Sequence, residues 1–251
     1  MQIITTAAIK GGTGKTTTAA ALAQAAAADG KRVLCIDLDP QGNLSFFTGA
    51  DQTQAGSYEL ITGSEPAQTM QRTEQGLTVI AASANLATLT TAPGSAKRLQ
   101  AAIAPIKGAF DFIFIDTPPQ MGELTYNALQ ASTGLLCPLE ADYSSLTGLY
   151  KIIGIADYMA ASNPDLSILG AILTRYDPRP KLNKYLQGVI AEKGAAAGAP
   201  LLMTIRAGVA IREAQTLQQS LFKYAPGSNP AKDYKMLYQM MKRRERRHGK
   251  S

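Results

Sequence analysis

The amino-acid sequence predicts an α/β fold, in which a doubly wound, mostly parallel β-sheet carries helices on both faces. Three observations predict it. Continuous apolar runs, rich in β-branched and aromatic residues, recur along the chain, as expected for strands that are buried on both faces. Segments with the composition of helices separate several of these runs. Some runs end in an acidic residue or a glycine-rich loop, and ligands of such sheets bind at the carboxyl ends of strands.

The predicted elements alternate along the chain. Strands are expected within residues 3–9, 33–36, 77–81, 110–115, 134–139 and 166–173, and helices at 17–28, 57–62, 122–131 and 231–247. In the last helix, Tyr234, Leu237, Tyr238 and Met241 recur at helical spacing and predict one buried apolar stripe. Residues 1–241 are expected to form a single domain, and residues 242–251 a basic C-terminal tail.

Charge is distributed unevenly along the sequence. The formal net charge is +6. Residues 242–250 contain six basic residues and one acid, so they contribute +5 and leave the preceding body near +1. No apolar run approaches the roughly 18 residues of a membrane span. Cys35 and Cys137 lie inside apolar runs, where they are expected to be buried thiols in a reducing cytoplasm. A cytoplasmic protein is therefore expected.

A phosphate-binding loop is predicted between the first strand and the first helix. Its glycines let backbone N–H groups point inward, and the start of the helix favours an anion. Lys15 is expected to reach the β- and γ-phosphates of a nucleotide, and the Thr16 hydroxyl to bind Mg²⁺. The strict pattern for such a loop places glycine where this chain has Ile9, and the chain has an additional lysine, Lys10, at the front of the loop. The residues expected to bind the phosphates are Gly11, Gly12, Thr13, Gly14, Lys15, Thr16 and Thr17.

Acidic residues end two of the predicted strands beside this loop. Asp37 and Asp39 follow the strand at 33–36, and Asp116 ends the run at 110–115. Carboxylates near a triphosphate are repelled unless Mg²⁺ or a water molecule lies between them. Asp116 is therefore expected to hold Mg²⁺, Asp37 to be an outer-sphere partner of the metal, and Asp39 to position a water molecule.

These motifs resemble those of a known family. Lys10–Thr17 resembles the deviant Walker A box of the ParA/MinD family of P-loop ATPases. Asp37–Asn43 resembles the family's D-x-D-P-Q-G-N box, and Asp116–Pro119 its D-x-P-P ending. The resemblance implies an ATP- and Mg²⁺-dependent homodimer, in which Lys10 reaches the phosphates of the partner's nucleotide. It also implies that Lys10, Lys15 and Asp39 serve in catalysis.

The resemblance extends to the base-binding and surface segments. It places Thr174 near the base of the nucleotide. Many relatives have Ile-Pro in the adenine pocket, where this chain has Ile205 followed by Arg206, so these two residues are assigned to the pocket. The segment after Thr174 opens a basic region, which is interpreted either as a DNA-binding surface or as solvated loop residues. Its basic residues are Arg175, Arg179, Lys181 and Lys184.

The implied function is that of a ParA-like partition ATPase. Such a protein dimerises on ATP, binds DNA without sequence specificity, and segregates plasmid or chromosomal DNA with a ParB-like, centromere-binding adaptor that stimulates slow hydrolysis. The tail is interpreted as a DNA contact, with a solvated helix end and a membrane-surface contact as alternatives. A MinD-like or protein-cargo positioning ATPase is the other functional hypothesis. The tail has no large apolar residues between 242 and 250, which disfavours the membrane. Its DNA-binding candidates are Lys242, Arg243, Arg244, Arg246 and Arg247.

Overall fold

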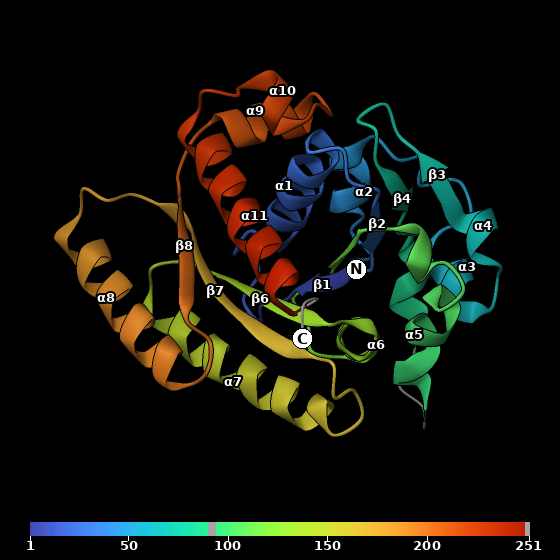
Figure 1. Cartoon of the computed structure of the whole chain (residues 1–251), viewed down its shortest axis with the longest axis horizontal. Helices are drawn as coiled ribbons and strands as arrows, with labels where there is room; N and C mark the ends of the chain where they lie inside the picture. The colour runs from blue at the N-terminus through green and yellow to red at the C-terminus, as the bar shows by residue number, and fades with distance from the viewer. Residues whose placement is uncertain (90–93, 249–251) are drawn as a thin grey trace.

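One eight-stranded sheet organises the chain (Figure 1). The computed structural model describes residues 1–89 and 94–248, of which 244–248 are described by their backbone alone. The strand order is β3-β4-β2-β5-β1-β6-β7-β8, and every neighbouring pair is parallel except β3 with β4. Strand β1 therefore lies in the middle of the sheet, between β5 and β6. The strands are β1 Gln2–Thr6, β2 Val33–Asp37, β3 Met70–Arg72, β4 Thr78–Ile80, β5 Phe112–Asp116, β6 Gly134–Leu139, β7 Ser167–Tyr176 and β8 Leu201–Arg206.

Helices cover both faces of the sheet, as Figure 1 shows. Helices α1, α2, α9, α10 and α11 lie on one side, and α6, α7 and α8 lie on the other. The helices are α1 Lys15–Ala28, α2 Asn43–Thr48, α3 Ser57–Thr62, α4 Pro66–Thr69, α5 Arg98–Ile103, α6 Glu123–Ala131, α7 Tyr143–Ala160, α8 Lys181–Ala196, α9 Ala210–Thr216, α10 Leu221–Tyr224 and α11 Asn229–His248, with short 3-10 turns at Ala84–Thr88, Ser95–Lys97 and Lys107–Ala109.

The alternation of side chains along each strand supplies a core to both layers. On β5, Phe112 and Phe114 face the layer that contains α1 and α11, whereas Ile113 and Ile115 face the layer that contains α5 and α6. All four side chains are fully buried. The doubly wound, mostly parallel sheet predicted from the sequence is therefore confirmed.

Several predicted elements are confirmed, and some bounds differ. The helix at 57–62 and the strand at 134–139 have the predicted limits. The first strand, expected within residues 3–9, ends at Thr6. The following helix begins at Lys15, two residues earlier than predicted, because Gly14 adopts the left-handed conformation (φ 85°) and serves as its N-cap. Strand β7 continues past the predicted end at 173 to Tyr176.

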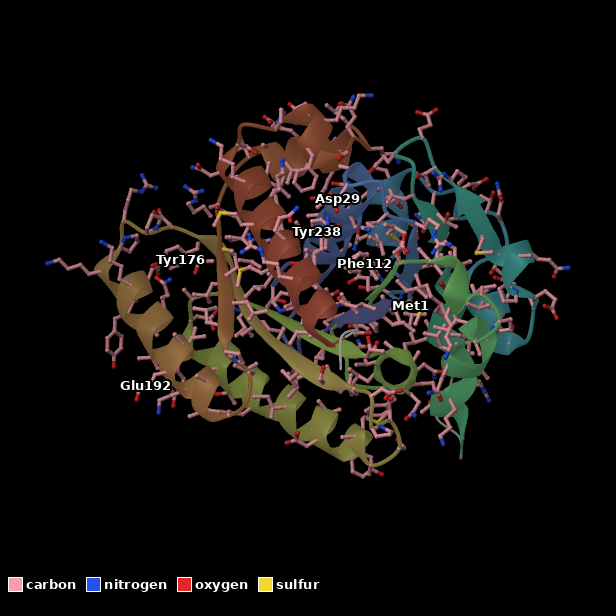
Figure 2. All side chains as sticks on the ribbon, viewed as in Figure 1. Met1, Asp29, Phe112, Tyr176, Glu192 and Tyr238 are labelled. Carbon is pink, nitrogen blue, oxygen red and sulfur yellow. The ribbon has the colours of Figure 1, made fainter. Side chains whose placement is uncertain are left out.

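Helix α11 packs its predicted stripe against the body. Tyr234, Leu237, Tyr238 and Met241 are all buried. The ring of Tyr238 meets that of Phe112 edge to face, with centroids 5.9 Å apart, and its hydroxyl donates to Asp29 at 2.7 Å (Figure 2). The helix thus joins the centre of the sheet to the end of α1. The domain limit at residue 241 stays a prediction, and α11 continues through it to His248.

Candidate active site

The glycine-rich loop lies between β1 and α1, at the carboxyl edge of the sheet. Gly12 and Gly14 both have positive φ values, 77° and 85°. A Cβ atom on Gly14 would stand 3.4 Å from the Thr174 side chain, so the loop and the end of β7 are in close contact there. The Thr174 hydroxyl donates to the Thr13 carbonyl at 2.7 Å and fixes this contact. The loop consequently leads directly into the first N–H groups of α1, which form an anion site.

Two buried carboxylates stand side by side at the same edge. Asp37 ends β2 and Asp116 ends β5, and the two residues are partners in the parallel register. Burial and the charge of Asp37 raise the pKa of Asp116 well above its usual range, against the opposing effects of Thr16 and Lys15. Burial likewise raises the pKa of Asp37 to about 6, despite its hydrogen bonds to Ser45 and to the Asp39 backbone. Such a concentration of negative charge favours a cation.

The hydrogen bonding of the two carboxylates differs. Asp37 accepts the Ser45 amide at 2.8 Å, the Ser45 hydroxyl at 2.7 Å and the Asp39 amide at 3.1 Å, so both of its oxygens are engaged. Asp116 accepts a long, 3.4 Å bond from the Thr6 hydroxyl at Oδ1, and among the described residues its buried Oδ2 has no partner within hydrogen-bonding geometry. An unpartnered buried carboxylate oxygen fits a bound metal ion.

A bound Mg²⁺ would use few protein ligands. The described part of the chain has no group of three His, Cys, Asp or Glu residues that would hold a metal by itself. Mg²⁺ is commonly held by one or two carboxylates together with water and substrate phosphates. The residues present fit that mode, with Asp116 and the Thr16 hydroxyl as candidates and Asp37 in the outer sphere.

Lys15 is buried next to these acids. Its pKa is lowered by burial, and the charges of Asp116 and Asp39 act in the opposite direction. Asp39 is also buried, and its Oδ1 accepts the Gln41 amide at 3.0 Å. The structure therefore places the predicted phosphate-binding lysine, the predicted metal ligand and the predicted water-positioning acid around one point.

Lys10 differs from Lys15 because its side chain is 42% exposed. Its ammonium group donates to Glu140 at 3.0 Å and to Asp142 at 2.6 Å, and these two bonds raise its pKa. Asp142 is also the N-cap of α7, where it accepts the Ser145 amide. In the single chain Lys10 thus binds acids that lie about 130 residues away in the sequence. Its expected contact with a partner's nucleotide stays a prediction.

A cavity of about 550 Å³ adjoins the loop. It is lined by Gly14, Thr17, Thr174, Ile205 and Arg206, all of which were predicted to contact the nucleotide. Arg206 is restrained by Asp233, which accepts from its guanidinium at 2.9 and 2.6 Å. The cavity's position favours a base and ribose site. Sequence reasoning missed its other lining residues, which are Arg175, Ala207, Gly208, Val209, Ile211, Arg212, Gln215 and Tyr234.

The sequence contains little that would identify these additional lining residues as part of a nucleotide site. Residues 207–215 follow β8 and carry no phosphate-loop or strand-end motif, and Tyr234 was assigned to the core of α11. Gln215 donates to the Thr17 hydroxyl at 3.0 Å, a contact across 198 residues that no local pattern predicts.

The predicted DNA-binding residues are separated in the structure. Arg175 lines the nucleotide cavity, with a positive φ of 51°, and donates to Glu140 at 3.4 Å. The Arg179 guanidinium makes bonds of 2.7 to 3.1 Å to the Asp177 carboxylate. Lys181 and Lys184 are exposed on α8. Lys242 pairs with Asp29 at 2.5 Å, and Arg243 is exposed. The side chains of Arg244, Arg246 and Arg247 lie outside the described residues.

Comparison with known proteins finds chromosome-partitioning ATPases among the relatives of this chain. The AAA domain family model matches residues 1–168. The chromosome-partitioning ATPase Soj of Thermus thermophilus is 35% identical over 231 residues, which is 91% of this chain and 90% of that protein. The chromosome partitioning protein ParA of Caulobacter vibrioides is 37% identical over 195 residues, 73% of each chain.

Solved structures of nucleotide-bound proteins share the fold of this chain. Cobyrinic acid a,c-diamide synthase from Mycobacterium smegmatis, with bound ATP analog and magnesium, has a TM-score of 0.84 and 29% identity, over 98% of this chain and 96% of that one. The septum site-determining protein MinD of Pyrococcus horikoshii, complexed with Mg-ADP, has a TM-score of 0.79 and 26% identity, over 96% and 95%. The fold and the loop with its strand-end acids define a P-loop nucleotide hydrolase. Within that class, the chain belongs to the ParA/MinD family of deviant Walker A ATPases, a family of ATP hydrolases.

Proposed function

We propose that the protein is a ParA-like ATPase that dimerises on ATP and Mg²⁺, binds DNA without sequence specificity, and segregates plasmid or chromosomal DNA with a centromere-binding adaptor. The observation that carries this proposal is the pair of lysines at the phosphate loop. Lys15 is buried beside Asp39 and Asp116, whereas Lys10 is exposed at the front of the loop. This difference supports a role for Lys15 at the chain's own nucleotide and a role for Lys10 at the nucleotide of a second protomer.

The chain's residues have separate roles in this proposal. The N–H groups of the loop and Lys15 bind the phosphates, while Thr16 and Asp116 hold Mg²⁺ with Asp37 in the outer sphere. When bound there, Mg²⁺ would neutralise negative charge on the phosphates. Asp39 orients the attacking water molecule. Lys10 supplies a second cation to the partner's γ-phosphate, as an arginine finger does.

Release of Lys10 is a required step of this cycle. The contacts with Glu140 and Asp142 must break before Lys10 can reach across a dimer face. Both acids and Lys10 are solvent-exposed to 28% or more, so the pair costs little to separate. The γ-phosphate of ATP would replace the two carboxylates as the anionic partner of Lys10. ADP lacks this phosphate and would not replace them. The nucleotide dependence of dimerisation follows.

The DNA-binding role is supported by charge and by the relatives. Residues 242–250 carry a net charge of +5, and two such tails in a dimer would roughly double the number of phosphate contacts. The relatives Soj and ParA are chromosome-partitioning proteins. None of the helices in the described part of the chain has the length and apolar character needed to cross a bilayer.

The test compares ATP with ADP, both with Mg²⁺. Sedimentation should show a dimer with ATP and a monomer with ADP, and random-sequence duplex DNA should be bound more tightly with ATP. Equal binding in the two nucleotides would contradict the proposed switch. Co-sedimentation with anionic vesicles that depends on ATP and on residues 242–250, without DNA binding, would instead favour the MinD-like function. Retained ATPase activity without binding to DNA or vesicles would favour a protein-cargo role.

A further inference from the structure

A second cavity lies at the opposite end of α1 from the phosphate loop. It has a volume of about 890 Å³ and is formed by the loop after α1, the β3–β4 turn and the segment around α10. The first residue of α1 that lines this cavity, Gln24, comes nine residues after Lys15, a separation of about 14 Å along the helix. The cavity therefore belongs to neither the phosphate site nor the base site.

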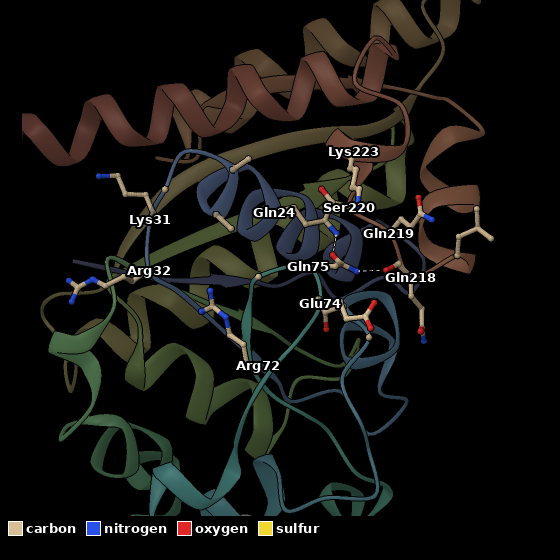
Figure 3. Close-up of a pocket in the computed structure, with 17 residues that line it drawn as sticks. Gln24, Lys31, Arg32, Arg72, Glu74, Gln75, Gln218, Gln219, Ser220 and Lys223 are labelled. Atoms are coloured by element: carbon tan, nitrogen blue, oxygen red, sulfur yellow. Dashed lines mark hydrogen bonds between the residues drawn. The ribbon is translucent and has the colours of Figure 1, made fainter.

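Four cations surround this cavity. Figure 3 shows Lys31, Arg32, Arg72 and Lys223 around its opening. Lys31 and Arg32 are adjacent, and the other two come from separate parts of the rim. Glu74 is the one acid among the described residues that line it. Arg32 is offset by Asp111, which accepts from its guanidinium at 3.1 Å. No ion pair involves Lys31, Arg72 or Lys223 within the described part of the chain, which leaves their charge available to a partner.

The rim is fixed by a network of glutamines at the floor of the cavity. The buried Gln24 donates to Gln75 at 2.8 Å and accepts the Leu221 amide at 3.1 Å. Gln75 in turn donates to the carbonyls of Phe47 and Gln218, at 2.7 and 2.8 Å. The segments that carry Lys31, Arg72 and Lys223 are thereby tied together. A partner would meet a preformed arrangement of charge, so little ordering would be required on binding.

The start of the basic tail lies at the same end of the molecule. Lys242 pairs with Asp29, which directly precedes Gly30 and Lys31 on the rim. This contact fixes the last turns of α11 beside the end of α1. Arg243 follows and is exposed. The positive charge of the cavity rim is thus continuous with that of the C-terminal tail. The sequence alone does not indicate this continuity.

We propose that this distal basic surface, made of Lys31, Arg32, Arg72, Lys223, Lys242 and Arg243, is the surface by which the protein binds the phosphate backbone of DNA. The proposal rests on the DNA-binding part of the proposed function and assigns it to a site. The partner's chemistry follows from the surface: several cations from separate segments, polar amides and no large apolar face match a polyanion. A surface at the far end of α1 also stays accessible when two nucleotide sites face one another.

The experiment uses two triple variants of the full-length protein that lose the same charge. The distal variant is Lys31→Gln, Arg72→Gln and Lys223→Gln. The matched control is Lys181→Gln, Lys184→Gln and Lys193→Gln, three exposed residues of α8, a helix on the opposite side of the sheet from α1 and α11. Affinity for a random-sequence duplex is measured with ATP and Mg²⁺ at several salt concentrations. Circular dichroism and ATPase activity verify that both variants are folded and active.

The distal variant should lose affinity and salt dependence. Each phosphate contact contributes about 0.9 to the slope of log K against log salt, so three lost contacts would reduce it by about 2.7 per protomer. The control should retain the parent's slope. A distal variant that binds like the parent would overturn the assignment, and so would equal losses in the two variants, which would mean that net charge alone matters. Failure of the parent itself to bind DNA would instead refute the DNA-binding part of the proposed function.

Discussion

The two ends of the sheet both carry clustered cations, but they use them differently. At the nucleotide end, Lys10, Arg175 and Arg179 are each within 3.4 Å of a carboxylate of the same chain. At the distal end, Arg32 and Lys242 are also paired with acids, but no ion pair involves Lys31, Arg72 or Lys223 within the described residues. A cation that has an internal acid is restrained and partly neutralised, whereas one without an acid remains available to a polyanion. Counting basic residues in a sequence segment cannot make this distinction.

The comparison predicts that the two ends can be disabled separately, and the largest effect is expected at Lys10. In Lys10→Ala the partner's γ-phosphate loses its second cation, so ATP hydrolysis by the dimer should fall on the order of 10³-fold, by analogy with loss of an arginine finger. DNA binding with ATP should fall to the level seen with ADP, although the distal surface is intact. Single-turnover hydrolysis and sedimentation with ATP measure these effects. A variant that still dimerises with ATP and hydrolyses it normally would refute the role of Lys10.

Truncation after Lys242 should give the opposite pattern. It removes five cations and one acid, a net charge of +4, and retains the Lys242–Asp29 contact that anchors α11. The slope of log K against log salt for DNA should fall by up to about 3.6 per protomer, while dimerisation with ATP and basal hydrolysis persist. Fluorescence anisotropy with labelled duplex measures the slope. Lost dimerisation would mean that the two ends are not independent.

Buried acids at the nucleotide end should make folding stability depend on pH. Asp37 has a pKa of about 6 in the folded chain, where burial disfavours its charge, against about 3.9 when unfolded. The native state therefore binds the proton more tightly. Its contribution to the free energy of unfolding is complete below about pH 4 and is lost as the pH rises through 6, by about 3 kcal/mol. Urea unfolding between pH 4 and 7.5 measures it.

Asp37→Asn is the matched variant for this prediction. The amide keeps an oxygen that accepts hydrogen bonds from Ser45 but cannot ionise, so the decline between pH 4 and 6 should become shallower. The raised pKa of Asp116 acts in the same direction, and a residual slope is expected from it. An unchanged pH profile in Asp37→Asn would show that Asp37 does not titrate in this range.

The sequence predicts those features of the fold and the site that are determined by residues close together in the chain. The loop from Lys10 to Thr17 and the acids at 37, 39 and 116 were predicted because a glycine loop or a strand-end acid is defined by its immediate neighbours. The apolar stripe of α11 was predicted for the same reason, and its four residues are buried. Helical and strand periodicity acts over a few residues, and the sequence displays it directly.

What the sequence did not predict arises from contacts between distant segments. Arg175 was grouped with surface residues by its neighbours, but β7 ends beside the loop, and the side chain lines the nucleotide cavity. The carboxylates that bind Lys10 lie beyond β6, and nothing near residue 10 indicates them. The distal surface joins Lys242 of the predicted basic tail to residues near 31, 72 and 223, each of which is unremarkable within its own segment. Pairing of charges is a property of the tertiary structure.

The smallest expected effect tests pairing directly, with one acid at each end. Asp29→Asn frees Lys242 at the distal surface, and Asp177→Asn frees Arg179 at the nucleotide end. Each variant gains one net positive charge, but only Asp29→Asn should raise DNA affinity, by a few-fold at low salt, because it alone adds a free cation to the proposed surface.

Stability provides an independent measurement on the same two variants. Asp29 also accepts from the buried Tyr238, so Asp29→Asn should lower the free energy of unfolding by about 1 kcal/mol. Asp177→Asn breaks a surface pair whose arginine side chain is 88% exposed, and no measurable change is expected. If Asp177→Asn were instead the variant that gained DNA affinity, DNA would bind at the nucleotide end. The assignment of DNA binding to the distal surface would then be wrong.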